Sequence, residues 1–268
     1  GLEDDSEIRQ RLAHVLADAS LRVVCQPIVN LETNELVGLE ALARFPRPLR
    51  QTTEAWFKEA ERVGLGVTLQ LTAVKAALSL LDDIPHPAFL AINVGPDALV
   101  NDELYGLLEA ADASRIVIEL TEHLKIDDYL HLRRVLQRIR SLGPRLAIDD
   151  TGAGFASLSH VVNLAPDLIK LDHQLTQGVD LEPDRRALAH SLSRFATEIG
   201  AKVIAEGLEN AGEVHTVRQL GIRYGQGYFI SRPAPLDAIL RQFPQSAAIP
   251  RGVNQGLRLG GQPTSSRY

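Results

Sequence analysis

This sequence has few of the features that indicate the cellular compartment or the membrane attachment of a protein. Only one of the 268 residues is a cysteine, Cys25, so the chain cannot form an internal disulfide or a cysteine-rich zinc site. No apolar run approaches the roughly 20 residues that span a bilayer. We therefore expect a soluble, cytoplasmic piece without membrane contact of its own, or the cytoplasmic portion of a larger protein that is itself bound to a membrane.

An excess of basic charge is also lacking, and so is methionine. The net charge is −6 at pH 7, and acidic and basic residues are mixed along the chain, so no basic surface of the kind that binds DNA is expected. The absence of methionine, even at position 1, suggests a portion of a longer protein. With 45% hydrophobic and 23% charged residues, the composition is that of a globular protein that can bury a sizeable core.

Short apolar or β-branched runs alternate with longer segments of helical periodicity, which is typical of an α/β protein with a largely parallel sheet. Only about six residues, 30–35, join the first two runs, too few for a crossover helix, so we expect an antiparallel hairpin there. The eight runs are Arg22–Val29, Leu36–Ala41, Phe89–Val94, Arg115–Leu120, Arg145–Asp149, Leu168–Leu171, Lys202–Ala205 and Ile222–Tyr224. The main helical segments between them are Ala55–Leu81, Asp97–Ala111, Asp128–Leu142, Arg185–Ile199 and Ala211–Leu220.

Eight strands with intervening helices, in a span near the roughly 250 residues usual for such barrels, predict a modified (β/α)8 barrel of the TIM type with an antiparallel first strand. We expect this single domain to fill residues 21–249. A lead-in helix is expected in residues 1–20, where Ile8, Leu12 and Val15 have helical spacing. The tail, residues 250–268, is rich in Gly, Ser, Gln and Arg and is expected to be a linker or a disordered end.

Polar residues end every predicted strand after the first. An isolated acidic residue in such a position is usually a loop residue or a helix cap. Seven strand ends of this kind need another explanation, because barrel enzymes build their active sites at the carboxyl ends of the strands. We therefore expect one site formed by Glu40, Asn93, Glu119, Asp149 with Asp150, Lys170 with Asp172, Glu206, and Gln226.

The make-up of this set predicts a site for divalent cations. Carboxylates and a carboxamide, without histidine or cysteine, form an oxygen-only ligand set that suits Mg²⁺ or Mn²⁺ rather than zinc. Adjacent carboxylates such as Asp149 and Asp150 also need cations to offset their repulsion. Two ions about 3.5–4 Å apart would polarise a phosphoryl oxygen and activate a water for attack on a phosphodiester. Lys170 could orient that water, and Arg44, just beyond Glu40, could bind a phosphate.

The motifs around these residues resemble those of the EAL-type cyclic di-GMP phosphodiesterases. Glu40-Ala41-Leu42 spell the signature of that family. Further matches follow in order through most of the chain, at Gln26-Pro27-Ile28, Asn93-Val94, Glu119-Leu120-Thr121-Glu122, Asp149-Asp150, Ile169-Lys170-Leu171-Asp172, Ala205-Glu206-Gly207-Leu208-Glu209 and Gln226-Gly227-Tyr228. The resemblance implies hydrolysis of cyclic di-GMP to linear pGpG with two Mg²⁺ or Mn²⁺ ions. Ca²⁺ is expected not to support turnover, because its longer bonds would misplace the water.

The resemblance also implies roles for individual residues. Its implied ligands are Glu40, Asn93, Glu119 and Asp149 for one ion and Asp149 and Asp150 for the second, with Glu206 as a base or metal-site carboxylate and Lys170 near the catalytic water. The catalytic set is thus Glu206, Lys170 and Asp150. The expected substrate-binding set is Gln26, Leu42, Arg44, Asp172, Glu209 and Gln226, and Glu122 is expected to anchor a loop.

Alternatives stay open at this stage. Thr151 and Ala153 stand where the family pattern has Phe and Thr, and some family members bind the dinucleotide without hydrolysing it, so a catalytically weak or inactive receptor module is the second hypothesis. A third treats Lys170 as the Schiff-base lysine of an aldolase-like barrel, although nearby carboxylates would keep its amine protonated. The resemblance further implies a homodimer and, in the full-length protein, attached sensory or diguanylate cyclase domains.

Overall fold

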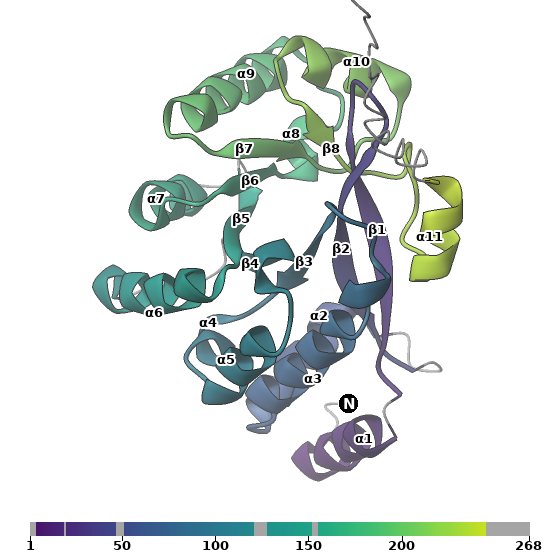
Figure 1. Cartoon of the computed structure of the whole chain (residues 1–268), viewed down its shortest axis with the longest axis vertical. Helices are drawn as coiled ribbons and strands as arrows, with labels where there is room; N and C mark the ends of the chain where they lie inside the picture. Colours follow the sequence, from purple (N-terminus) through teal and green to yellow (C-terminus); the bar gives the residue numbers. More distant parts are fainter. Residues whose placement is uncertain (1–3, 19, 47–50, 121–127, 152–154, 245–268) are drawn as a thin grey trace, which may run out of the picture.

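Eight strands close into a barrel in the computed structural model, which describes residues 4–18, 20–46, 51–120, 128–151 and 155–244 (Figure 1). The strands follow one another around the barrel in chain order: β1 (Arg22–Asn30), β2 (Leu36–Arg44), β3 (Phe89–Asn93), β4 (Ile116–Leu120), β5 (Arg145–Thr151), β6 (Leu168–Leu171), β7 (Lys202–Ala205) and β8 (Tyr224–Gly225). β1 pairs antiparallel with β2 and with β8, and the other neighbouring pairs are parallel. The predicted TIM-type barrel with an antiparallel first strand is confirmed.

The helices lie outside the strands (Figure 1). They are α1 (Asp5–Ala17), α2 (Thr53–Arg62), α3 (Gly66–Leu78), α4 (Pro96–Leu99), α5 (Asp102–Glu109), α6 (Tyr129–Leu142), α7 (Phe155–Leu164), α8 (His173–Thr176), α9 (Pro183–Glu198), α10 (Ala211–Gln219) and α11 (Leu236–Gln242). Two segments that were predicted as single helices are each divided into two helices in the structure, so their predicted continuity was wrong. The first is broken at Gly64, whose φ of +77° ends α2, and the second at Asn101, whose side chain accepts a hydrogen bond from Glu103 N–H and caps α5.

Several strand boundaries also differ from the sequence prediction. β2 continues to Arg44, so Glu40 lies in the middle of this strand rather than at its end, where it pairs with Gln26 of β1. Arg115 belongs to a 3-10 turn (Ala113–Arg115) that precedes β4, and Ile222 precedes β8. The long hairpin of β1 and β2 explains the first difference, because antiparallel strands can continue to pair beyond the rim of the barrel.

The barrel interior contains an apolar layer on which the candidate site rests. Its buried members come from six strands and are Ile28, Phe89, Ala91, Val117, Ala147, Leu168 and Ile204. Gly38 of β2 belongs at the same level, because a Cβ there would lie 2.4 Å from the ring of Phe89. A larger cluster of buried side chains, between the strands and the surrounding helices, forms the main hydrophobic core.

The lead-in helix α1 packs against α2. Ile8, Leu12 and Val15 are buried in one cluster with Trp56, and Arg11 forms an ion pair with Glu59. The helix predicted in residues 1–20 is therefore present as α1. The predicted linker or disordered end, residues 250–268, lies outside the described residues.

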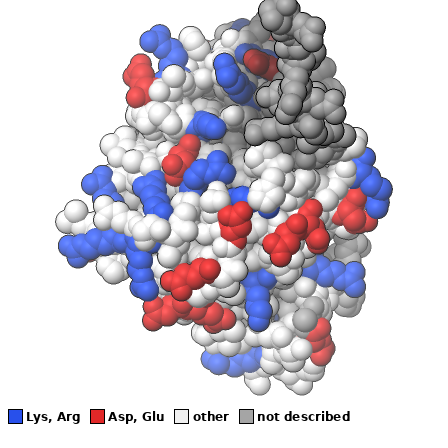
Figure 2. Space-filling model, viewed as in Figure 1, with Lys and Arg blue, Asp and Glu red and all other residues white. Residues whose placement is uncertain are grey.

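Charges of both signs are interspersed on the face of the molecule shown in Figure 2. Among the described helices, none is both long enough and apolar enough to cross a membrane.

Candidate functional site

The alternation of side chains along the parallel strands places the polar residues inside the barrel. In a strand, every second side chain faces the same side. Steps of two residues lead from the apolar layer to the candidate site: from Ala91 to Asn93, from Val117 to Glu119, from Ala147 to Asp149, from Leu168 to Lys170 and from Ile204 to Glu206. The polar cluster therefore lies directly above the apolar layer, toward the carboxyl ends of the strands.

Lys170 lies at the centre of the cluster. Its side chain is fully buried, and its Nζ atom contacts carboxylate oxygens from four strands or strand ends. The distances are 2.9 Å to Glu206 Oε1, 3.0 Å to Glu119 Oε2, 3.3 Å to Glu40 Oε2 and 3.3 Å to Asp149 Oδ1. The structure thus brings together residues that are far apart in the chain. The most distant of them, Glu40 and Glu206, are separated by 166 positions.

Two amides link the carboxylates to one another. Gln226 Nε2 donates to Glu40 Oε2 at 2.7 Å and to Glu206 Oε1 at 3.0 Å. Asn93 Nδ2 donates to Glu40 Oε1 at 3.3 Å. Because both oxygens of Glu40 accept hydrogen bonds, the orientation of this carboxylate is well defined.

A bulge in β5 explains how two successive residues reach the same site. In a regular strand Asp149 and Asp150 would point to opposite faces. The register between β5 and β6 shifts between Ile148 and Thr151, and Asp150 adopts a left-handed conformation with φ of +54°. Bulges of this kind redirect side chains near active sites, and aspartate tolerates the left-handed region better than most residues. Both carboxylates therefore face the cluster.

Glu206 is held by backbone contacts just after β7. Its N–H donates to the carbonyl of Leu171 at 3.2 Å, and its carbonyl accepts a hydrogen bond from Thr176 Oγ1. The chain then turns at Gly207, which has φ of +62° and packs so closely on His173 that a Cβ would lie 2.5 Å from the Cβ of His173. A side chain at this position would therefore disturb the placement of Glu206.

The electrostatics of the cluster reflect an excess of negative charge. Burial raises the pKa of Glu119 well above its usual value, and Glu40 and Asp149 raise it further, whereas Lys170 lowers it. The pKa of Glu206 is also well above its usual value, mainly because of burial. Burial on its own would lower the pKa of Lys170, but the surrounding carboxylates raise it well above its usual value. An amine that stays protonated is a poor nucleophile, which disfavours the Schiff-base hypothesis.

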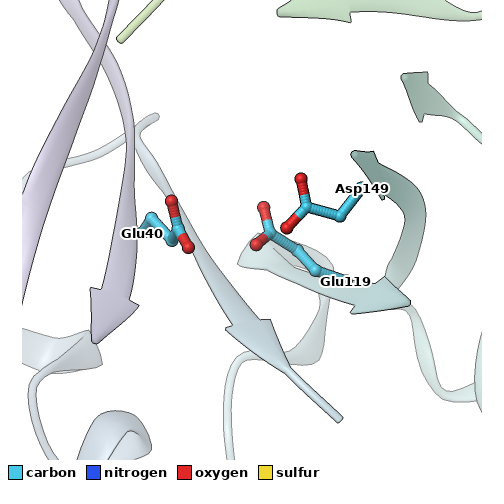
Figure 3. Close-up of side chains that lie close together, drawn as sticks. All are labelled: Glu40, Glu119 and Asp149. Atoms are coloured by element: carbon cyan, nitrogen blue, oxygen red, sulfur yellow. The ribbon is translucent and has the colours of Figure 1, made fainter. Parts of the chain in front are cut away.

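The carboxylate oxygens fall into two groups that each fit a divalent cation. Glu40, Glu119 and Asp149 form one group, and Figure 3 shows these three side chains pointing toward one another. Asp149, Asp150 and Glu206 form the other, and within each group the ligand atoms lie within 4.8 Å of one another. Glu119 Oε1 is buried without a hydrogen-bond partner, as expected of an atom that a cation would satisfy. The residues present therefore fit Mg²⁺ or Mn²⁺.

Two cavities flank the cluster and contain most of the predicted substrate-binding residues. One, of about 350 Å³, is bordered by Glu40, Glu206 and Gln226 and is lined by Gln26, Leu42 and Glu209. The other, of about 300 Å³, lies between β2 and the helices α2 and α3 and is lined by Leu42, Arg44 and Asn93.

Among the predicted substrate-binding and loop-anchoring residues, two are not placed in these cavities, namely Asp172 and Glu122. Asp172 is buried, and its Oδ1 accepts from Gln174 N–H at the start of α8 and lies 3.3 Å from His173 Nδ1. This carboxylate therefore caps a turn. Glu122, the expected loop anchor, lies outside the described residues, as does Ala153. Thr151 is described, and its buried hydroxyl has no hydrogen-bond partner.

Three side chains that line the first cavity were not identified from the sequence. His173 begins α8, Gln177 directly follows this helix, and Tyr228 follows Gln226 by two positions. An aromatic residue next to the last strand end was a usable signal for Tyr228. The short helix α8 offered none, because four residues are too few for a helical periodicity.

Comparisons with known proteins identify the family of this chain. A model of the EAL domain family matches residues 9–233. The probable cyclic di-GMP phosphodiesterase PdeB of Escherichia coli K12 is 28% identical over 86% of this chain and 46% of its own length. A cyclic di-GMP phosphodiesterase of Pseudomonas aeruginosa is 30% identical over 81% of this chain and 39% of its own length. The chain thus spans less than half the length of these curated relatives.

A solved structure shows a similar fold. BlrP1 of Klebsiella pneumoniae, in a manganese and cyclic di-GMP complex, has a TM-score of 0.72 and 30% sequence identity. The similarity covers 80% of this chain and 56% of that one.

Proposed function

Because this chain belongs to the EAL domain family, we propose that it is a metal-dependent phosphodiesterase that hydrolyses cyclic di-GMP to linear pGpG. One observation carries the proposal: five carboxylates form two adjacent oxygen groups that share Asp149. When all five are ionised, the protonated Lys170 leaves four negative charges, which equals the charge of two divalent cations. A receptor that only binds the dinucleotide would have no need of so complete a ligand set.

In this proposal Glu40, Asn93, Glu119 and Asp149 hold one ion, and Asp149, Asp150 and Glu206 hold the second. Asn93 fits this role because its amide nitrogen binds Glu40, so that its oxygen can face a cation. When bound, two such ions polarise a phosphoryl oxygen and lower the pKa of a water.

The protein's own groups orient the reactants. Lys170 Nζ keeps Glu206 and Asp149 in place. Its three N–H groups are taken up by the surrounding carboxylates, so one of them would turn to the water that attacks phosphorus only once bound cations take over a carboxylate contact. Glu206 would accept a proton from that water through its other carboxylate oxygen, because Oε1 already accepts from Gln226 and contacts Lys170. The Glu206 side chain is 13% exposed, whereas Glu119 is fully buried. The P–O bond to the ribose 3′-oxygen breaks as the new P–O bond forms, and the 3′-oxygen takes up a proton from solvent to become the 3′-hydroxyl of pGpG.

The two flanking cavities suit a ligand with two bases. Leu42 lines both cavities, of about 350 and 300 Å³, and the phosphodiester would lie beside it at the cluster. In this arrangement Arg44 contacts a phosphate, and Gln26, Glu209 and Gln226 contact the other half of the substrate. The similar structure of BlrP1, which is a complex with manganese and cyclic di-GMP, supports this assignment of substrate.

The test is incubation of the purified protein with cyclic di-GMP and Mg²⁺, Mn²⁺ or Ca²⁺, followed by separation of the products. We expect pGpG with Mg²⁺ and Mn²⁺ and none with Ca²⁺. Glu40→Ala should abolish hydrolysis, because it removes an oxygen ligand, whereas Glu32→Ala, at an exposed glutamate in the hairpin turn, should retain the wild-type rate. Binding of cyclic di-GMP without product would instead establish the receptor function.

A further inference from the structure

A third cavity lies at the opposite mouth of the barrel, where the parallel strands begin. It is open and measures about 740 Å³. Its lining includes the first residues of six strands, namely Leu36, Phe89, Arg145, Leu168, Lys202 and Tyr224. The apolar layer of the barrel interior separates this cavity from the carboxylate cluster, so the two are distinct sites.

Two cationic side chains face this cavity without an anionic partner. Arg145 lies over the ring of Phe89, with its Cζ 4.9 Å from the ring centroid, and Lys202 Nζ lies 5.6 Å from the centroid of Tyr224. In the described part of the chain, neither side chain forms a hydrogen bond or an ion pair. The guanidinium alone therefore offers five donors that nothing in these ranges satisfies.

The nearby acids do not neutralise these cations. Asp167 attracts Arg145, but its Oδ2 accepts from Leu146 N–H at 2.8 Å and lies 3.6 Å from Arg140 Nη2. Glu35, the one carboxylate among the described lining residues, is exposed and accepts from Thr33 Oγ1. Burial lowers the pKa of Arg145, so holding its charge here is unfavourable in the absence of a partner.

A purely structural role does not account for this arrangement. Residues at the amino-terminal face of such barrels usually contribute to stability, and an apolar side chain would cover Phe89 or Tyr224 without the cost of desolvating a charge. Two positive charges and two aromatic rings, in a hollow large enough for a small molecule, instead supply the contacts that an anion attached to a flat ring system would use.

We propose that this cavity binds an anionic ligand with a planar ring, of the nucleoside monophosphate class. Arg145 and Lys202 would contact the phosphate, since a guanidinium can bind it through two hydrogen bonds. The rings of Phe89 and Tyr224 and the side chains of Leu168 and Ile204 would contact the base and sugar. The cavity volume exceeds what an inorganic phosphate would fill. This proposal does not depend on the hydrolysis of cyclic di-GMP.

Calorimetric titration of the full chain with AMP tests the proposal, in EDTA so that divalent ions do not bring the nucleotide to the carboxylate cluster. We expect saturable binding of AMP, with inorganic phosphate and adenosine each binding at least about tenfold more weakly, because each lacks one of the two contact types. Absence of AMP binding would overturn the proposal. Equal binding of adenosine would overturn the role of the cations, and equal binding of phosphate would overturn the role of the rings.

Substitutions locate the site. Arg145→Gln and Lys202→Gln should each weaken AMP binding by about tenfold or more, as expected for loss of a charge-assisted contact. Lys202 is exposed, so the Lys202→Gln variant keeps its core intact. It therefore tests the proposal even where the Arg145→Gln variant fails to fold. The matched controls are Lys58→Gln and Arg194→Gln, which remove exposed helical charges paired with Glu54 and Glu198 and should leave AMP affinity unchanged. Equal affinity in the Lys202 variant and in the controls would refute the assignment.

A second measurement does not depend on calorimetry. AMP should slow the acetylation of Lys202 relative to that of Lys58 in the same sample, as quantified by mass spectrometry of peptides. Equal protection of both lysines would contradict binding at this cavity.

Discussion

Replacement of Lys170 by methionine is the most informative perturbation of the carboxylate cluster, because methionine keeps an unbranched apolar side chain and removes the charge together with the N–H donors of the amine. The lysine Nζ has no exposed surface and contacts four carboxylates at 2.9–3.3 Å. Removal of one partner from a buried ion pair typically costs about 3–5 kcal/mol, since it leaves an uncompensated charge. We expect a decrease of this size in the free energy of unfolding of the metal-free protein at neutral pH.

The effect should depend on pH in a defined direction. The pKa of Lys170 is raised, so its contribution to stability is fully present at neutral pH and would be lost only at a pH above that raised value. In the variant, the carboxylates can reduce their repulsion only by taking up protons. The stability difference between Lys170→Met and the wild type should therefore shrink as the pH is lowered.

Urea unfolding offers a direct assay. Trp56, the single tryptophan, is buried on α2 and stacks on Phe45, so its fluorescence should report unfolding, with circular dichroism as an independent probe. Lys75→Met, at an exposed position of α3, is the matched control and should change stability by less than about 0.5 kcal/mol. Equal stability of Lys170→Met and wild type at neutral pH, or a difference that grows on acidification, would refute the reasoning.

Three further predictions concern groups elsewhere in the cluster and in the core. The raised pKa values of Glu119 and Glu206 mean that a cation must displace protons, so calorimetry should show Mn²⁺ affinity increasing with pH; an affinity independent of pH would contradict this. Burial raises the pKa of Cys25 to about 11, so a thiol reagent at mildly alkaline pH should label this residue only after unfolding, and rapid labelling of native protein would disprove its burial. Arg115 is buried and donates to the carbonyls of Leu81, Ile84 and Ala88, so Arg115→Ala should lower the free energy of unfolding by about 2–4 kcal/mol in urea titrations, and a loss under 1 kcal/mol would argue against these bonds.

The barrel and much of its polar inner face could be predicted because both follow from local patterns. Alternation within one strand is enough to place Glu119 or Asp149 on the same side as the apolar residue two positions earlier. The short link between the first two strands was enough to predict the hairpin, since it excludes a crossover helix. These predictions needed no knowledge of contacts between distant parts of the chain.

Other features depend on contacts that no local pattern encodes. Asp150 reaches the cluster only because β5 carries a bulge, and an Asp-Asp pair in a regular strand would have the same sequence. Arg115 was expected in a strand, yet the structure buries its guanidinium among carbonyls of the turn before β3. The cavity at the opposite mouth combines first residues of strands that are far apart in sequence, and each of them alone has the appearance of an ordinary strand residue.

The position of Lys170 shows how far the site acts as one unit. From the sequence, this lysine was expected in the same site as the carboxylates and near the catalytic water, but the sequence did not indicate which carboxylates it contacts. In the closed barrel its Nζ contacts members of both oxygen groups, with Glu40 and Glu119 in one and Glu206 in the other, while Asp149 belongs to both. A change in the charge of Lys170 must therefore alter the affinity of both groups for cations, and occupancy of one group must alter that of the other through the same amine. In the proposed enzyme, the two cations would for this reason bind as a coupled pair rather than at independent sites.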